Sequence, residues 1–215
     1  NNDDLWMVSG GVKSTFEPLY LAVNLINSRI NGSWTAAPFT IKDINGAPAH
    51  DAVAVAINPN NKSQVFVGMW DNGLFEFNNG QVTNIFTAQN SVLDSVFFGP
   101  TKIGTVAFDN NNNLWVTSSF ANNILAVKTP NNKWNSFSFP SLTNNNDVYL
   151  DMLIDNNNYK WIVNSVRNSI IIFDDNGTLD ITSDDRTAYL PPTLNNPNLQ
   201  GLNIYCIKED LDGEI

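Results

Sequence analysis

Short apolar segments alternate along the chain with clusters of Asn, Asp and Gly. The clearest example joins an apolar segment at 105–108 to a second one at 114–116 through the polar run 109–113. The same order recurs at 151–163, and a weaker copy lies at 53–67. Short apolar segments bounded by turn residues predict β-strands, and Asn and Asp favour tight turns because they tolerate positive φ. The pattern therefore predicts a series of antiparallel hairpins.

An aromatic residue marks the second strand of each copy. Phe66, Trp115 and Trp161 stand 49 and 46 residues apart, and Trp6 lies 60 residues before Phe66. A fifth copy begins at Tyr205. Two further strands are expected in each complete copy, the third at 73–77, 124–127 and 170–173 and the fourth at 81–86, 133–137 and 178–181. Four strands in about 45 residues are typical of a β-propeller blade.

We therefore expect an all-β fold, a β-propeller of four-stranded antiparallel blades with about four blades present as part of a seven-bladed propeller. The chain is treated as one partial domain, residues 1–215, with approximate blades at 1–50, 51–100, 101–147 and 148–201 and the first strand of the next blade at 202–215. The first blade lacks its first strand. Trp6, Trp115 and Trp161 are expected to wedge between neighbouring blades.

Two alternatives to this arrangement were weighed. A β-sandwich would use similar strands, but a sandwich does not repeat at a fixed period. The best helical candidate, residues 19–26, fits an extended strand equally well. The periodicity therefore favours the propeller over both.

Composition supports a turn-rich fold and narrows the partners. The chain has 36 Asn against 12 Gly and 10 Pro, and its net charge is −10. A strongly acidic protein is poorly suited to nucleic acid or to an anionic membrane surface, since both need a basic patch. No apolar run approaches the roughly 18 residues of a membrane-spanning helix. We therefore expect no nucleic-acid partner and no membrane insertion.

The residues available for metal or thiol chemistry are few. One His and one Cys exclude a zinc site of the usual type. Cys206 lies in a strand-like run and is expected to be a small buried hydrophobe. Asp174, Asn176, Thr178 and Asp180 have the alternate spacing of calcium ligands, but the Gly and Glu positions of an EF-hand do not match, so plain hairpin turns are preferred. We expect no metal and no cofactor.

One face of the propeller is the candidate binding surface. Loops between second and third strands share a face with the connections between blades, and they carry exposed aromatic and polar residues suited to a partner or a glycan. The candidate residues are His50, Asp51, Trp70, Asp71, Asn72, Phe120, Asn122, Arg167 and Asn168. Trp70 and Phe120 could instead pack over the blade edge.

Catalytic signals are weak. The neighbours His50 and Asp51 hint at acid–base chemistry, although a loop His bonded to its own turn explains the pair as well. The sequence has no nucleophile elbow and no phosphate-binding Gly-rich loop. No catalytic residue is therefore assigned.

The blade pattern resembles a known family. An aspartate, an Asn/Gly turn, Leu-Trp-Val, and then Gly-Leu and a Phe are similar to two-component-regulator propeller repeats, which occur in extracytoplasmic sensor regions of Bacteroidetes hybrid histidine kinases. The longer stretches 28–34, 48–61, 173–180 and 204–215 look closer to the PorZ-like surface proteins of the type IX secretion system. The likeness runs through nearly the whole chain.

The resemblance implies a function as well as a fold. It implies a non-catalytic propeller at the cell surface or in the periplasm, associated with the outer membrane, that acts as a scaffold or recognition module in the attachment complex. The implied partners are proteins of this secretion complex and anionic lipopolysaccharide or another glycan. The alternative is the ligand-sensing propeller of a hybrid histidine kinase, and a third class is a propeller lyase or hydrolase.

Overall fold

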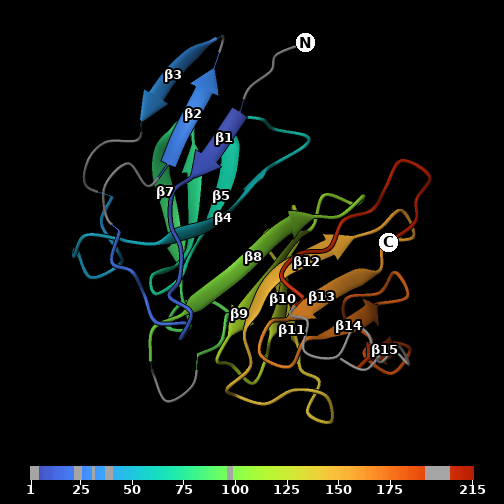
Figure 1. The fold of residues 1–215 in the computed structure, drawn as a ribbon. Coiled ribbons are helices and arrows are strands. Elements are labelled where there is room, and N and C mark those ends of the chain that lie inside the picture. The colour runs from blue at the N-terminus through green and yellow to red at the C-terminus, as the bar shows by residue number, and fades with distance from the viewer. Residues whose placement is uncertain (1–4, 22–25, 31, 37–40, 96–98, 192–203) are drawn as a thin grey trace.

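The computed structural model describes residues 5–21, 26–30, 32–36, 41–95, 99–191 and 204–215. Within these residues all regular secondary structure is β-strand, which confirms the all-β prediction (Figure 1). The strands are β1 (Leu5–Val8), β2 (Ile26–Ile30), β3 (Ser33–Ala36), β4 (Ala52–Ile57), β5 (Gln64–Met69), β6 (Gly73–Asn78), β7 (Gln81–Phe86), β8 (Lys102–Phe108), β9 (Leu114–Ser119), β10 (Leu125–Lys128), β11 (Trp134–Phe137), β12 (Tyr149–Ile154), β13 (Lys160–Asn164), β14 (Ser169–Asp174) and β15 (Arg186–Leu190).

The strands form separate antiparallel sheets in chain order. β1–β3 make a three-stranded sheet, and β4–β7, β8–β11 and β12–β15 make three four-stranded sheets. The first strands β4, β8 and β12 contact one another in sequence, and the sheets spread outward from them (Figure 1). This is the blade arrangement of a propeller, and the sheets do not close into a ring. The first described sheet has the order β1-β2-β3, and β1 carries Trp6.

An aspartate organises the turn between the first and second strands. The carboxylate of Asp109 accepts the backbone N–H of Asn113 at 2.7 Å, and its other oxygen accepts the indole N–H of Trp115 at 2.9 Å. Asp155 makes the same 2.9 Å bond to the indole of Trp161. The aspartate therefore closes the turn and fixes the rotamer of the aromatic anchor.

Positive φ angles explain the abundance of Asn. Many of the left-handed positions are Asn at the tips of turns, where the side chain compensates locally for the steric cost of this conformation. These residues are Asn79, Asn112, Asn132, Asn158, Asn168 and Asn176.

The hydrophobic core lies between neighbouring sheets rather than within one layer. Phe66 packs toward the β8–β11 sheet. Trp115 stacks on Phe137 of its own sheet and packs toward the β12–β15 sheet, where it meets Phe173 edge-on. Trp6 is half-buried against the β4–β7 sheet. Each anchor thus faces the following blade. Trp161, on the last described sheet, is only half-buried.

Two strand predictions differ from the structure. The fourth strand of the last sheet is β15 rather than residues 178–181, because Thr178 bonds the carboxylate of Asp184 and prolongs the turn. The fifth copy forms no strand within 204–215, although Ile207 is buried and donates its N–H to Asp151 at 3.0 Å. Residues 19–21 are not helical, and residues 22–25 of the helical candidate lie outside the described part of the chain.

Candidate functional site

His50 and Asp51 form a pair that connects two blades. The His50 Nδ1 atom lies 3.1 Å from Asp51 Oδ2, and the Asp51 side chain is fully buried. Asp51 also accepts the backbone N–H groups of Tyr20 and Leu21 at 2.8 and 3.0 Å. The His50 backbone donates to Asn72 Oδ1 at 3.0 Å. The bonds to Asp51 hold the β1–β2 connection, and the bond to Asn72 holds the segment before β4 against the second sheet, so Asp51 has a positioning role.

Trp70 is fully buried, and its packing over the blade edge replaces the expectation of an exposed aromatic. Its indole N–H donates to the carbonyl of Phe16 at 3.0 Å, and its ring meets Phe120 edge-on at a centroid distance of 6.2 Å. The ammonium of Lys102 lies 5.3 Å from the ring centroid and pairs with Asp71. Trp70 therefore joins three segments and is not available to a ligand.

Unusual backbone conformations gather around this aromatic group. Four residues here have a positive φ, which is 59° at Phe16, 60° at Tyr20, 55° at Asp51 and 54° at Phe120. Bulky residues rarely adopt the left-handed region, and each such residue costs roughly 1–3 kcal/mol. Packing against Trp70 and His50 sustains the strain. Strain of this kind is more common at functional surfaces than elsewhere.

The remaining candidates continue along the same face. Phe120 donates its backbone N–H to the Asp147 carbonyl at 2.9 Å, and Arg167 Nε donates to Asp147 Oδ1 at 2.8 Å. Asn122 donates its backbone N–H to Asp94 at 2.9 Å. Asn168 has a φ of 53° and a buried side-chain oxygen without a partner. A continuous line of contacts thus runs from His50 to Arg167 across three blades.

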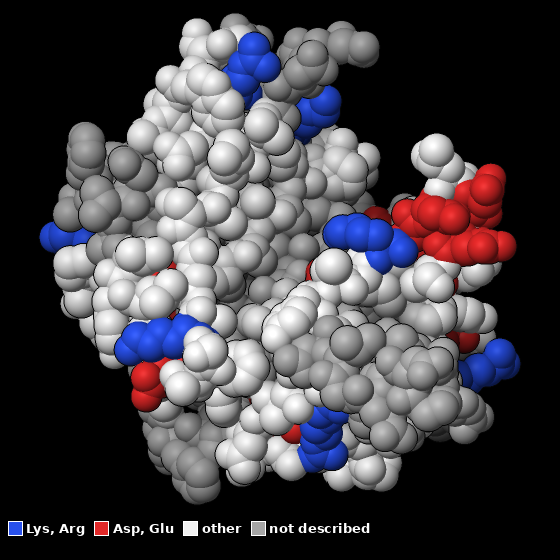
Figure 2. All heavy atoms as spheres, in the orientation of Figure 1, with Lys and Arg blue, Asp and Glu red and all other residues white. Residues whose placement is uncertain are grey.

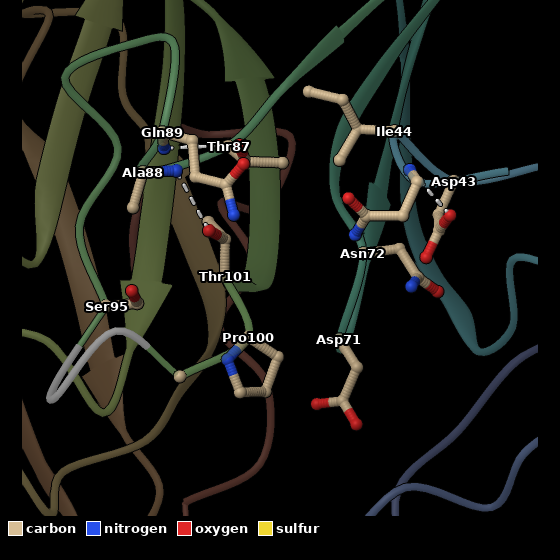
Figure 3. A pocket seen from close by; sticks show the side chains of 12 residues that line it. Asp43, Ile44, Asp71, Asn72, Thr87, Ala88, Gln89, Ser95, Pro100 and Thr101 are labelled. Atoms are coloured by element: carbon tan, nitrogen blue, oxygen red, sulfur yellow. Dashed lines mark hydrogen bonds between the residues drawn. The ribbon is translucent and has the colours of Figure 1, made fainter. Parts of the chain in front are cut away.

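A pocket of about 420 Å³ opens beside Asp71 and Asn72 (Figure 3). One wall carries Asp43, Ile44 and Asn72, and the facing wall carries Thr87, Gln89 and Thr101 (Figure 3). The other lining residues are Asn45, Asp71, Ala88, Ser95, Gly99 and Pro100. Most of the lining residues are polar, and Ile44 is an exposed large hydrophobic side chain among them.

Hydrogen bonds fix both walls of this pocket. Asp43 accepts the backbone N–H groups of Asn45 and Ala47, each at 2.9 Å. Ala88 donates its N–H to Thr101 Oγ1 at 2.9 Å. Asp71 is neutralised by Lys102. The pocket is therefore preformed, and hydrogen-bonding groups rather than net charge dominate it.

Sequence reasoning missed most of the lining residues. It placed Asp71 and Asn72 on this face but named none of the connection 87–101 or of the turn at Asp43. The rule that connections between blades share the face of the second-to-third loops already covers residues 87–101. The Asp43 turn gave no such signal, because nearby residues 37–40 have no clear strand pattern.

The candidate calcium turn does not assemble. Asp174 accepts the N–H of Asn176 at 2.8 Å, whereas Asp180 accepts an amide from Asn135 at 3.0 Å on another blade. Among the described residues, no group of three or more His, Cys, Asp or Glu side chains is arranged to hold a metal ion. Cys206 is exposed, so the prediction that it is buried is wrong.

Comparisons with known proteins identify similar folds. No family model matches the sequence, and no curated protein sequence matches it significantly. PorZ, an essential bacterial surface component of the type IX secretion system of Porphyromonas gingivalis, is 27% identical over 86% of this chain, with a TM-score of 0.73. The extracellular domain of a putative hybrid two-component system from B. thetaiotaomicron is 13% identical over 87% of this chain, with a TM-score of 0.59. Virginiamycin B lyase from Staphylococcus aureus is 16% identical over 88% of this chain, with a TM-score of 0.56.

These similarities confirm the resemblance to PorZ and to sensor propellers, and they confirm the propeller fold. The likenesses to the sensor domain and the lyase show the fold alone. The chain spans 26% of the PorZ chain, 23% of the sensor chain and 56% of the lyase chain. Among the residues that the structure describes, none forms a helix with the length and hydrophobicity needed to cross a bilayer.

Proposed function

We propose that this chain is a non-catalytic recognition propeller of a Bacteroidetes surface protein that acts in type IX secretion. Its role is to hold a protein partner of the attachment complex, with anionic lipopolysaccharide or another glycan as a further ligand. The observation that carries the proposal is the likeness to PorZ, because 27% identity accompanies a TM-score of 0.73 over most of the chain. PorZ and the sensor domains share the propeller scaffold, and a role in secretion is the more specific part of the proposal.

The loop face suits recognition rather than chemistry. Its pocket is lined by amides, hydroxyls and two aspartates, one of them paired with Lys102. His50, the one His in the sequence, has its ring against Tyr20 at a centroid distance of 4.9 Å and its Nδ1 beside Asp51. Both contacts favour a role in positioning.

Charge is sparse on the face of the molecule that Figure 2 shows. In the view of Figure 2 most of the surface is uncharged, and acidic side chains gather at the edge near the C-terminal segment. That segment carries Glu209, Asp210, Asp212 and Glu214. This largely uncharged face suits contacts with a protein or a glycan through hydrogen bonds and apolar groups.

The test substitutes a pocket residue in the full-length protein. Ile44→Asp places a third carboxylate at the pocket and removes its exposed apolar contact. We expect loss of partner pull-down and release of secreted cargo from the surface. Leu211→Asp is the matched control, because Leu211 is fully exposed and lies outside the pocket.

The outcomes separate the candidate functions. Unchanged partner binding and cargo attachment in Ile44→Asp, and also after deletion of the whole region, would refute the proposal. Intact secretion with loss of an oligosaccharide-dependent transcriptional response would favour the sensor. Turnover of a substrate that depends on His50 would favour a lyase or hydrolase.

A further inference from the structure

A second polar pocket lies between the β4–β7 and β8–β11 sheets, on the face that carries the turns between first and second strands. Its volume is about 230 Å³. Three turns surround it, and their lining members include Asn58, Asn112 and Asn132. The buried side chains of Glu76 and Lys128 also line it, each only 6% exposed. This pocket shares no residue with the one beside Asp71.

The Glu76 carboxylate is already satisfied by amides. It accepts N–H groups from Gln64 at 2.6 Å, Asn84 at 2.7 Å and Asn78 at 3.3 Å. Asn58 in turn donates to the Gln64 side-chain oxygen at 2.5 Å. Hydrogen bonds to a carboxylate delocalise and compensate its charge. Glu76 therefore builds the wall of the pocket and leaves little capacity for a ligand cation.

Lys128 is less well satisfied. Its ammonium donates to Asn132 Oδ1 at 2.5 Å and lies 5.7 Å from the centroid of the Phe66 ring. An ammonium has three N–H donors, so within the described residues two of them have no protein acceptor. Burial lowers the pKa of Lys128, and the charge of Glu76 opposes this shift. Among the described residues no carboxylate forms an ion pair with this ammonium, and a buried ammonium without a contacting anion is costly, which favours an incoming acceptor.

Asn112 supplies the complementary group. Its side-chain oxygen is buried and has no hydrogen-bond partner among the residues that the structure describes, and its backbone has a φ of 62°. A buried acceptor without a donor costs roughly 1–3 kcal/mol. The pocket thus contains both a donor and an acceptor that lack partners.

We propose that this pocket binds a small carboxylate with a hydroxyl or amino group on the adjacent carbon. The carboxylate oxygens accept the spare N–H groups of Lys128, and the adjacent group donates to Asn112 Oδ1. Each water in a liquid takes roughly 30 Å³, so the pocket holds the volume of about seven waters. A molecule with six non-hydrogen atoms fits within that space and leaves room for ordered water. The site is independent of the proposed secretion role.

The test is titration calorimetry on the protein with L-lactate and L-alanine as probes. Acetate lacks the adjacent donor, and ethylene glycol lacks the carboxylate. We expect lactate or alanine to bind at least tenfold more tightly than acetate, and ethylene glycol not to bind. Binding of lactate alone identifies hydroxy acids as the ligand class, and binding of alanine alone identifies amino acids.

Two variants probe the two groups separately. Lys128→Met keeps the aliphatic stem and should reduce affinity at least tenfold, whereas Lys133→Met, at an exposed lysine nearby, should have no effect. Asn112→Gly tolerates the positive φ and should reduce lactate or alanine affinity to that of acetate. If Lys128→Met fails to fold, Asn112→Gly decides. Absence of binding at millimolar probe, or equal binding by Asn112→Gly, would show that the pocket holds only water.

Discussion

Replacement of Asp109 by Ala should destabilise the protein far more than replacement of Asp210. Asp109 is 5% exposed and accepts hydrogen bonds from two backbone N–H groups, the Asn113 amide and the Trp115 indole. Asp210 builds the same turn, accepting the N–H groups of Asp212 and Glu214 at 2.9 Å each, but it is exposed. The two substitutions therefore delete the same turn bonds in buried and exposed settings.

The magnitude follows from the donors that lose their acceptor. The turn N–H of Asn111 can turn to water, because Asn111 is exposed. The Trp115 indole, on a fully buried residue, and the Asn113 amide, on a residue 9% exposed, cannot do so easily. Each buried donor left unpaired costs roughly 1–3 kcal/mol, so Asp109→Ala should cost about 4 kcal/mol. The loss of stability in Asp109→Asn should lie between those of Asp210→Ala and Asp109→Ala, because the amide keeps one oxygen that can accept the turn N–H groups.

Urea denaturation followed by tryptophan fluorescence measures the free energies of unfolding. We expect Asp210→Ala to be the most stable of the three variants, Asp109→Asn to be intermediate and Asp109→Ala to be the least stable. Equal losses for the two Ala variants would mean that the indole bond adds nothing and that the turn alone accounts for the aspartate. A larger loss for Asp210→Ala would refute the reasoning.

Three further predictions concern other parts of the fold. Gly104→Ala should lower the free energy of unfolding by about 3 kcal/mol or more, because the new Cβ would lie 1.7 Å from the Tyr149 carbonyl oxygen. Gly177→Ala has open space and only its positive φ to oppose it, so it should cost about 1 kcal/mol. Chemical denaturation compares the two variants. Burial and the neighbouring Asp147 raise the pKa of Tyr149, so the folded state retains this proton where the unfolded chain loses it. Stability should therefore fall as pH rises above about 10, and Tyr149→Phe should remove part of that fall in thermal unfolding at alkaline pH. Cys206 should react with a thiol reagent in the native protein at a rate close to that in denaturant, and slow labelling would contradict its exposed position.

The local sequence was sufficient to predict the pairs of strands that a short turn connects. The bonds from Asp109 and Asp155 act over six residues, so the chemistry that fixes these hairpins is visible in the local sequence. The fourth strand of the last sheet was misplaced because Leu179 and Ile181 alternate with polar residues, as they would in a strand. Only the contact between Thr178 and Asp184, and the packing of Leu179 on a neighbouring blade, show that these residues belong to a longer turn.

The candidate surface was only partly predictable. The blade rule placed His50, Asp71 and Phe120 on one face, and contacts in the structure link them. Burial of Trp70 depends on Phe16 and Phe120, which lie 54 and 50 residues away in the sequence. Contacts of that separation are set by how blades stack, so no local pattern reports them. Cys206 was misjudged for the same reason, since apolar neighbours suggested a strand that needs a partner.

The turn at Asp210 has the same hydrogen bonds as the turns at Asp109 and Asp155. Asp210 donates its N–H to the Glu214 carbonyl at 2.8 Å, and the same bond links Asp109 to Asn113 and Asp155 to Tyr159. Contacts across so few residues involve short loops, which form in a fraction of a microsecond. A polypeptide with several such local turns has several places at which hairpin formation can begin.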